Sequence, residues 1–212
     1  MKHLLIAILL STFVLPYAFA QSIPKVLLFM RNAQKSGDLE YMLKKEVGVI
    51  KDTLEKSGYQ VVVATLDGSS FSAGSATVTA NIKLADVNVA DYAGFILPCL
   101  AVPSYPAPPG VSPEAIALVK GAISAGKPVA AQTGSLWTLA KAGLLKGKKY
   151  AYAMEEKSPY FAEATFAGTG VVRDGLIITS GICPFMALKT NAKDGTEQLA
   201  LALVAVMNGR AK

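Results

Sequence analysis

The stretch Lys127-Pro-Val-Ala-Ala-Gln-Thr-Gly-Ser135 is the part of this sequence from which the fold can be inferred. The apolar run Val129–Ala131 is typical of a buried strand, and the small residues around Gly134 are typical of a tight turn. An apolar helical pattern, Leu136–Ala142, begins directly afterwards. Open α/β sheets bind their ligands at the carboxyl ends of strands, where such a turn lies. We therefore expect a site at Thr133.

The sequence on the amino-terminal side of this stretch predicts one β–α–β unit. Lys25–Met30 is a continuous apolar run and is expected to form a buried strand. Asp38 is expected to cap a helix whose apolar residues continue until Gly58 stops it. Tyr59–Leu66 is expected to be the next strand, and this crossover implies a parallel pair.

The rest of the chain continues the alternation of strands and helices. We expect a strand at Tyr92–Leu97, a helix capped by Ser112, a hairpin at Val171–Thr179 and a last helix opening at Asp194. Three segments are expected to be less regular: a loop at 67–75, a short strand or hairpin at 77–89, and an exposed proline-rich loop at 103–113. The predicted fold is a three-layer α/β sandwich, flavodoxin-like and doubly wound, with a mostly parallel sheet.

Three ordered segments of the chain resemble the signatures of the DJ-1/PfpI (ThiJ) family, which is related to the class I glutamine amidotransferases. The longest is Ala125–Lys148, which is similar to the family's strand, elbow and helix. Arg173–Ser180 is similar to its D-G-x-x-x-T-S signature, and Tyr92–Pro98 to its strand ending in leucine–proline. The resemblance spans about Lys25 to Asn208.

The sequence departs from the family at the residues that carry its chemistry. The family's elbow cysteine corresponds to Thr133, and the next position, often histidine, is Gly134. A threonine hydroxyl is a weak nucleophile without a base. The only histidine of the chain is His3, which lies in the predicted leader. The family's cysteine–histidine mechanism is therefore excluded by composition.

The resemblance also implies a carboxylate on the first helix, beside the elbow. Counting back from Gly58 places Glu46 at that position, and Asp52 also falls on a matching acid. Because the preceding loop is longer than in the family, Glu40 is a second candidate. A solvent-exposed helix acid is the alternative interpretation for each of them.

The chain has two cysteines, and both correspond to loops that border the family's site. Cys99 follows the leucine–proline strand and Cys183 follows Thr179-Ser180. Our hypothesis is that they form a disulfide over the Thr133 pocket. Two buried inert cysteines, or one displaced reactive thiol, are the alternatives. Two cysteines without histidine do not make a zinc site, so no metal is expected.

The first twenty residues have the pattern of a cleavable signal peptide. An apolar run, Leu4–Leu15, follows a short basic start, and Ala18-Phe19-Ala20 gives a small–x–small cleavage motif. The run is shorter than the roughly 20 residues that a membrane span needs. We expect residues 1–20 to be removed and residues 21–212 to form one periplasmic or secreted domain, with no membrane association afterwards.

The charge of the chain does not indicate a nucleic-acid partner. The formal net charge is +6, but the lysines are spread along the sequence without interleaved aromatic residues. The resemblance implies a homodimer. No cofactor is expected.

The function expected from these features is a non-catalytic binding domain. A pocket lined by Thr133, Gly134, Ser135 and Glu46, with Cys99 and Leu100 in the neighbouring loop, would bind a small polar or anionic ligand. The alternative is an unorthodox enzyme, either a hydrolase or deglycase that uses Thr133 or a thiol-redox protein that uses Cys99 and Cys183.

Overall fold

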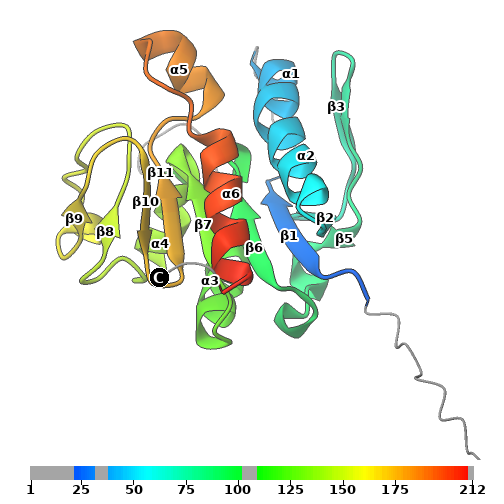
Figure 1. Ribbon diagram of the computed structural model, residues 1–212, viewed down its shortest axis with the longest axis horizontal. Helices are drawn as coiled ribbons and strands as arrows, with labels where there is room; N and C mark the ends of the chain where they lie inside the picture. Colours follow the sequence, from blue (N-terminus) through cyan, green and yellow to red (C-terminus); the bar gives the residue numbers. More distant parts are fainter. Residues whose placement is uncertain (1–21, 32–37, 102–108, 210–212) are drawn as a thin grey trace, which may run out of the picture.

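The core of the molecule is a seven-stranded sheet, seen edge to edge in Figure 1. This computed structural model describes residues 22–31, 38–101 and 109–209. The predicted signal peptide and most of the proline-rich loop lie outside these ranges. In spatial order the strands are β10 (Val171–Asp174), β11 (Ile177–Ser180), β7 (Val129–Gln132), β6 (Gly94–Leu97), β1 (Lys25–Met30), β2 (Gln60–Thr65) and β5 (Ile82–Lys83).

All neighbouring strands in this sheet are parallel except the pair β10–β11. β10 and β11 form the predicted hairpin, and Gly175 at its turn has a φ of +65°, where a side chain would be strained. From β1 the chain adds β2 and β5 on one side, and it then adds β6, β7 and β11 on the other side. The direction of winding therefore reverses between β1 and β6, which is the topological switch point of a doubly wound fold. The predicted mostly parallel α/β sandwich is confirmed.

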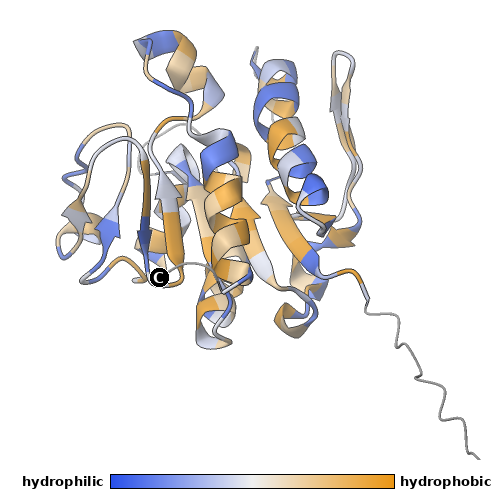
Figure 2. Cartoon of the chain, viewed as in Figure 1, coloured by the Kyte–Doolittle hydropathy of each residue, from blue (hydrophilic) through white to orange (hydrophobic). Residues whose placement is uncertain are grey.

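Helices cover both faces of the sheet. One face packs against α1 (Leu39–Met42), α2 (Val49–Lys56) and α6 (Thr196–Met207), and the other packs against α3 (Pro113–Ser124) and α4 (Leu136–Lys141). Figure 2 shows that the central strands and most of α6 are hydrophobic, while hydrophilic and hydrophobic residues alternate along α1 and α2. Burial of apolar surface from both sides explains why these strands read as continuous apolar runs.

The helix signals in the sequence were correct at two of three starts. The Ser112 hydroxyl accepts a hydrogen bond from the Ala115 N–H, and the Asp194 carboxylate accepts one from the Thr196 N–H. Asp38 stands before α1, but its side chain makes no capping hydrogen bond, so that expectation was wrong.

Three short features differ from the sequence-based expectation. The segment expected to be a loop contains β3 (Phe71–Ala73), which pairs with β4 (Ala76–Val78) to form a hairpin beside α1 and α2 (Figure 1). A seven-residue helix, α5 (Pro184–Thr190), follows β11, and two further two-residue strands, β8 (Lys149–Tyr150) and β9 (Thr165–Phe166), form a separate pair. These elements have too few residues for a hydrophobic periodicity to be recognised in the sequence.

None of the helices in the described ranges is long and apolar enough to cross a membrane.

Candidate functional site

The turn after β7 is a strained elbow with Thr133 at its apex. Thr133 has a φ of +42°, which is unfavourable for a β-branched residue, and its side chain is 6% exposed. The Ser135 hydroxyl holds the turn, because it donates to the Leu97 carbonyl at 2.7 Å and to the Gln132 carbonyl at 2.9 Å. The elbow is therefore fixed to the ends of β6 and β7.

Glu46 reaches this elbow from an irregular helical turn. The residues between α1 and α2, Leu43–Gly48, form a π-helical segment, and Glu46 lies in it with no exposed surface. Such segments are rare and occur frequently at functional sites. Lys44 and Lys45, the residues directly before Glu46, are exposed. The π-helical turn thus places one carboxyl group inside while its neighbours remain in solvent.

The Glu46 carboxyl group binds the backbone of the loop that follows β6. Its Oε1 accepts a hydrogen bond from the Cys99 N–H at 2.7 Å, and the Leu100 N–H also donates to the carboxyl group. Its Oε2 is buried without a hydrogen-bond partner among the described residues. Burial, and secondarily the nearby Cys183, raise the pKa of Glu46 well above its usual value. This group is therefore poised to hold a proton.

The other two candidate carboxylates lie on the outer surface. Glu40 is partly exposed and accepts hydrogen bonds from the Ser75 N–H and hydroxyl, and it pairs with Lys44. Asp52 is exposed on α2. Of the three acids considered from the sequence, the structure places only Glu46 beside the elbow.

The two cysteines meet over Thr133, and in this structure both are free thiols. Cys99 begins the short 3-10 turn Cys99–Ala101 after β6 and is partly exposed, while Cys183 precedes α5 and is 1% exposed. The two side chains are joined by a hydrogen bond from Cys99 to Cys183. The juxtaposition that the disulfide hypothesis requires is therefore present, without a covalent bond.

The surroundings of the two thiols shift their pKa values in opposite directions. Hydrogen bonding from Cys99 is the main cause that lowers the pKa of Cys183 to about 7; burial opposes it, and the Met186 and Phe185 N–H groups and the nearby Thr133 hydroxyl act in the same direction as Cys99. The hydrogen bond to Cys183, followed by burial and the Glu46 charge, raises the pKa of Cys99 well above its usual value. The pair therefore ionises first at Cys183.

A cationic group also approaches the site. Arg31 follows β1, its backbone N–H donates to the Leu100 carbonyl at 3.3 Å, and its guanidinium group is close enough to Cys99 for the two to interact electrostatically. Burial lowers the pKa of Arg31, and the interaction with Cys99 opposes that shift. A positive charge thus lies on the Cys99 side of the site.

The Thr133 hydroxyl is buried and has no hydrogen-bond partner in the described ranges. Cys183 lies near it. The same ranges contain no group of three or more side chains with metal-ligating chemistry. The arrangement can therefore ionise a thiol and hold a proton on a carboxyl group, but it does not activate the threonine.

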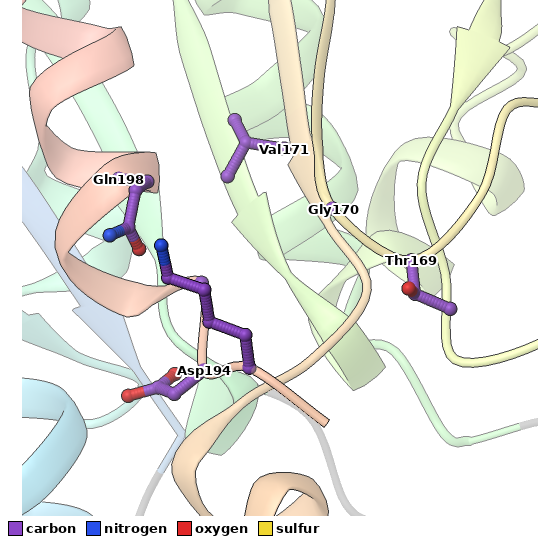
Figure 3. Close-up of a pocket in the computed structure, with 7 residues that line it drawn as sticks. Thr169, Gly170, Val171, Asp194 and Gln198 are labelled. Atoms are coloured by element: carbon purple, nitrogen blue, oxygen red, sulfur yellow. The ribbon is translucent and has the colours of Figure 1, made fainter. Parts of the chain in front are cut away.

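A separate hollow lies near the same edge of the sheet, at the start of α6. It has a volume of about 260 Å³ and is lined by residues preceding and opening β10 and by residues opening α6: Thr169, Gly170, Val171, Lys193, Asp194, Gly195 and Gln198 (Figure 3). None of the residues expected to line the elbow pocket belongs to it. Asp194 lines this hollow, and its charge also contributes to the raised pKa of Glu46 at the elbow.

The fold and this strand–elbow–helix site define an open α/β protein of the nucleophile-elbow class. The sequence model of the DJ-1/PfpI family matches residues 37–186, so the chain belongs to the DJ-1/PfpI family. No curated protein matches the chain.

Solved structures with similar folds are members of the same group. A ThiJ/PfpI domain protein from Brachyspira murdochii has a TM-score of 0.64 and 17% identity, covering 88% of this chain and 98% of its own. DJ-1beta from Drosophila melanogaster has a TM-score of 0.59 and 21% identity, covering 89% of this chain and 92% of its own. The oxidised DJ-1 of Toxoplasma gondii has a TM-score of 0.59 and 25% identity, covering 88% and 92%.

Proposed function

We propose that this chain is an exported DJ-1/PfpI domain in which two thiols, Cys99 and Cys183, replace the single elbow cysteine and cycle between a dithiol and a disulfide. The observation that carries this proposal is the proximity of the two thiols to each other, beside Thr133 and the buried Glu46. Disulfides form and persist on the oxidising side of a membrane, which is where the predicted signal peptide, cleaved after Ala20, would deliver the domain.

Thr133 is a poor choice for the reactive group, because its hydroxyl has no base among the described residues. Cys183 needs no histidine, because its hydrogen bonds lower its pKa to about 7 and produce a substantial thiolate fraction at neutral pH. A thiol-redox role is therefore better supported than a hydrolase or deglycase role.

The test is a redox titration of the mature protein, residues 21–212, in glutathione buffers, followed by mass spectrometry without reduction. We expect a single Cys99–Cys183 disulfide that forms and breaks reversibly. Two free thiols at every glutathione ratio would refute the proposal. Cys99→Ser and Cys183→Ser are the matched controls, since neither variant can close the bond.

A second candidate is the binding of a small anion at the elbow without catalysis. The Arg31 charge beside Cys99 favours it. Calorimetric titration of a Cys99→Ser/Cys183→Ser double variant with small carboxylates and phosphates tests this function separately from the thiols. Binding that disappears on Arg31→Gln would support it, and no heat signal would count against it. This second proposal includes two further expectations: the ligand is small, and the domain is the homodimer that the family resemblance implies.

A further inference from the structure

We infer that the hollow at the start of α6 binds a small zwitterion, such as a free α-amino acid, and that the bound molecule holds the loop leading to Cys183. This site is separate from the elbow and does not depend on the proposed redox function. The inference rests on the charges in the hollow, on an unpartnered buried hydroxyl beside it, and on the hydrogen bonds that join its two walls to Gly181 and Ile182.

Two opposite charges lie in the hollow without an ion-pair partner. Lys193 and Asp194 both line it, and neither belongs to an ion pair within residues 22–31, 38–101 and 109–209. A ligand with one charge would be attracted by one of these side chains and repelled by the other, whereas a zwitterion pairs with both. The volume of about 260 Å³ lies below the usual range of pockets for drug-sized molecules, so the ligand is small.

The first turn of the twelve-residue helix α6 provides donors for a carboxylate. The Asp194 carboxylate accepts from the Thr196 N–H at 3.0 Å and from the Thr196 hydroxyl at 2.7 Å, so it caps the first helical residue. Gly195 has no side chain to cap the next two N–H groups, those of Glu197 and Gln198, and the helix itself offers them no acceptor. Such N–H groups and the helix dipole favour a negative group at this end, and Gln198 lies on the same wall of the hollow as Asp194 (Figure 3).

A buried hydroxyl beside the hollow lacks a hydrogen-bond partner. Ser180 pairs with Val171 across the β10–β11 hairpin, so its side chain lies on the same face of the sheet as Val171, which lines the hollow. Ser180 has no exposed surface, and its Oγ has no hydrogen-bond partner among the described residues. It points at Gly195, since a Cβ on that glycine would lie 2.3 Å from this oxygen. Buried hydroxyls are usually hydrogen-bonded, so this one indicates a partner that enters through the hollow.

The two residues before Cys183 are attached to opposite walls of the hollow. On one side, the Gly181 N–H donates to the Thr169 carbonyl at 3.1 Å. On the other side, the Gly195 N–H donates to the Ile182 carbonyl at 3.0 Å. Thr169 and Gly195 both line the hollow. A ligand that contacts both walls therefore opposes their separation and keeps this loop closed.

The same loop is tied to the strand that carries the elbow. Gln132 is the last residue of β7, and its Nε2 donates to the Ile182 carbonyl at 2.7 Å and to the Thr196 hydroxyl at 3.3 Å. Hydrogen bonds from Asp194 through Thr196 to Gln132 thus join the hollow to the elbow. Ile182 is 3% exposed and Cys183 is 1% exposed, so a reagent reaches the Cys183 thiol only when this loop opens. Occupation of the hollow therefore slows reactions at Cys183.

Calorimetric titration of the mature protein with glycine, alanine and serine tests the binding. We expect alanine to bind with a Kd of about 1 mM or tighter, and propionate and ethylamine, which each carry one of its two charges, to bind at least about tenfold more weakly. Lys193→Gln and Asp194→Asn should each weaken binding at least about tenfold. The Asp194→Asn change retains an oxygen that can cap α6, so it tests the charge alone. Lys120→Gln, an exposed lysine on α3, is the matched control and should leave binding unchanged.

Three results would overturn the site. The first is that none of the three amino acids binds, and the second is that propionate binds as tightly as alanine. The third is binding that survives Lys193→Gln and Asp194→Asn but is lost in Arg31→Gln. That result would place the ligand at the elbow and support the anion site proposed there.

Alkylation of the Cys99→Ser variant by N-ethylmaleimide tests the effect on the loop, because Cys183 is then the only thiol of the chain. A ligand that binds only the closed loop lowers the open population, so we expect alkylation to slow by about tenfold at a ligand concentration of about ten times the Kd. The variant that also carries Asp194→Asn should show no such slowing at the same concentration. An unchanged alkylation rate in Cys99→Ser, with binding seen by calorimetry, would refute the effect on the loop.

Discussion

At the scale of single residues, the site is governed by which groups are buried with hydrogen-bond donors and which are buried without them. Cys183 has a lowered pKa of about 7 because backbone and side-chain donors surround its sulfur. Glu46 has a raised pKa because desolvation outweighs the two backbone N–H groups that bind it. Two ionisable neighbours are thus shifted in opposite directions: the pKa of the Cys183 thiol is lowered and that of the Glu46 carboxyl group is raised.

The burial of Glu46 predicts a specific pH dependence of stability. Because the pKa of Glu46 is raised on folding from about 4.5, the folded state holds the proton more tightly, and stability falls as pH rises above 4.5. Glu46→Gln removes this loss. We expect the variant to gain on the parent as pH rises from 4.5 toward 7, by at most about 1.4 kcal/mol per pH unit.

Urea denaturation at half-unit steps between pH 4 and 7 measures this difference. That window lies below the ionisation of Cys183 at about 7, so the thiol contributes little to it. Asp52→Asn, on the exposed side of α2, is the control and should show a flat difference. A constant offset between Glu46→Gln and the parent would contradict the prediction.

At the scale of elements, the β3–β4 hairpin is held against the first helix by one side chain. The Glu40 carboxylate accepts from the Ser75 N–H at 3.0 Å and from the Ser75 hydroxyl at 2.8 Å. Gly74 makes this approach possible, since a Cβ there would lie 1.9 Å from Glu40 Oε2 and its φ is +57°. Glu40, which the sequence offered as a second candidate for the carboxylate beside the elbow, therefore has a structural role at the hairpin turn.

We expect Glu40→Ala to speed amide hydrogen exchange at Ser75 and its neighbours in the hairpin, with little change at β1 or β7. The Lys44 and Ser75 contacts lower the pKa of Glu40 to about 2, so in the parent these contacts persist at pH 4 and are lost only as pH falls through about 2. Hydrogen-exchange mass spectrometry at pH 7 tests the variant. Asp52→Ala, an exposed acid on the same helical segment, should leave hairpin exchange unchanged, and a uniform increase throughout the sheet would argue against a local clamp.

At the scale of the whole molecule, a Cys99–Cys183 bond would link two loops that are far apart in the chain but meet at one edge of the sheet. It would close a loop of about 85 residues, which in the chain-entropy model contributes about 4 kcal/mol of stability. Folding lowers the pKa of Cys183 in the reduced protein from 9.0 to about 7. Ionisation of this thiol therefore stabilises the folded reduced protein as pH rises above 7. The oxidised and reduced forms should therefore differ in stability in a pH-dependent way.

We expect the oxidised form to be more stable by roughly 4 kcal/mol near pH 6. Above pH 7 the folded reduced protein loses a proton that the unfolded chain keeps until pH 9. The reduced form then gains up to about 2.7 kcal/mol, and the advantage of oxidation shrinks accordingly. Urea denaturation of both forms at pH 6 and pH 9 measures the change. A Cys99→Ser/Cys183→Ser variant should show no effect of reductant at either pH, and an advantage of oxidation that is equal at both pH values would contradict the prediction.

Sequence reasoning identified the elements whose local pattern is long and continuous. β1, β6 and β7 are apolar runs, α3 carries its Ser112 cap, and the Lys127–Ser135 stretch predicts the elbow. The π-helical turn, α5 and the β3–β4 hairpin were missed, because their formation depends on packing against neighbours rather than on a local period. Met186 and Phe185, which donate to Cys183, were missed for the same reason.

The amino-acid sequence alone establishes the family, the parallel α/β fold, the absence of cysteine at the elbow and the absence of any histidine beyond His3. These are properties of residue type and order, so they need no coordinates. Packing in three dimensions places Glu46, rather than Glu40 or Asp52, at the elbow, and it surrounds the sulfur of Cys183 with more hydrogen-bond donors than that of Cys99. The physical reason is that burial and hydrogen bonding arise between loops that are distant in sequence, and these interactions set the pKa of each group.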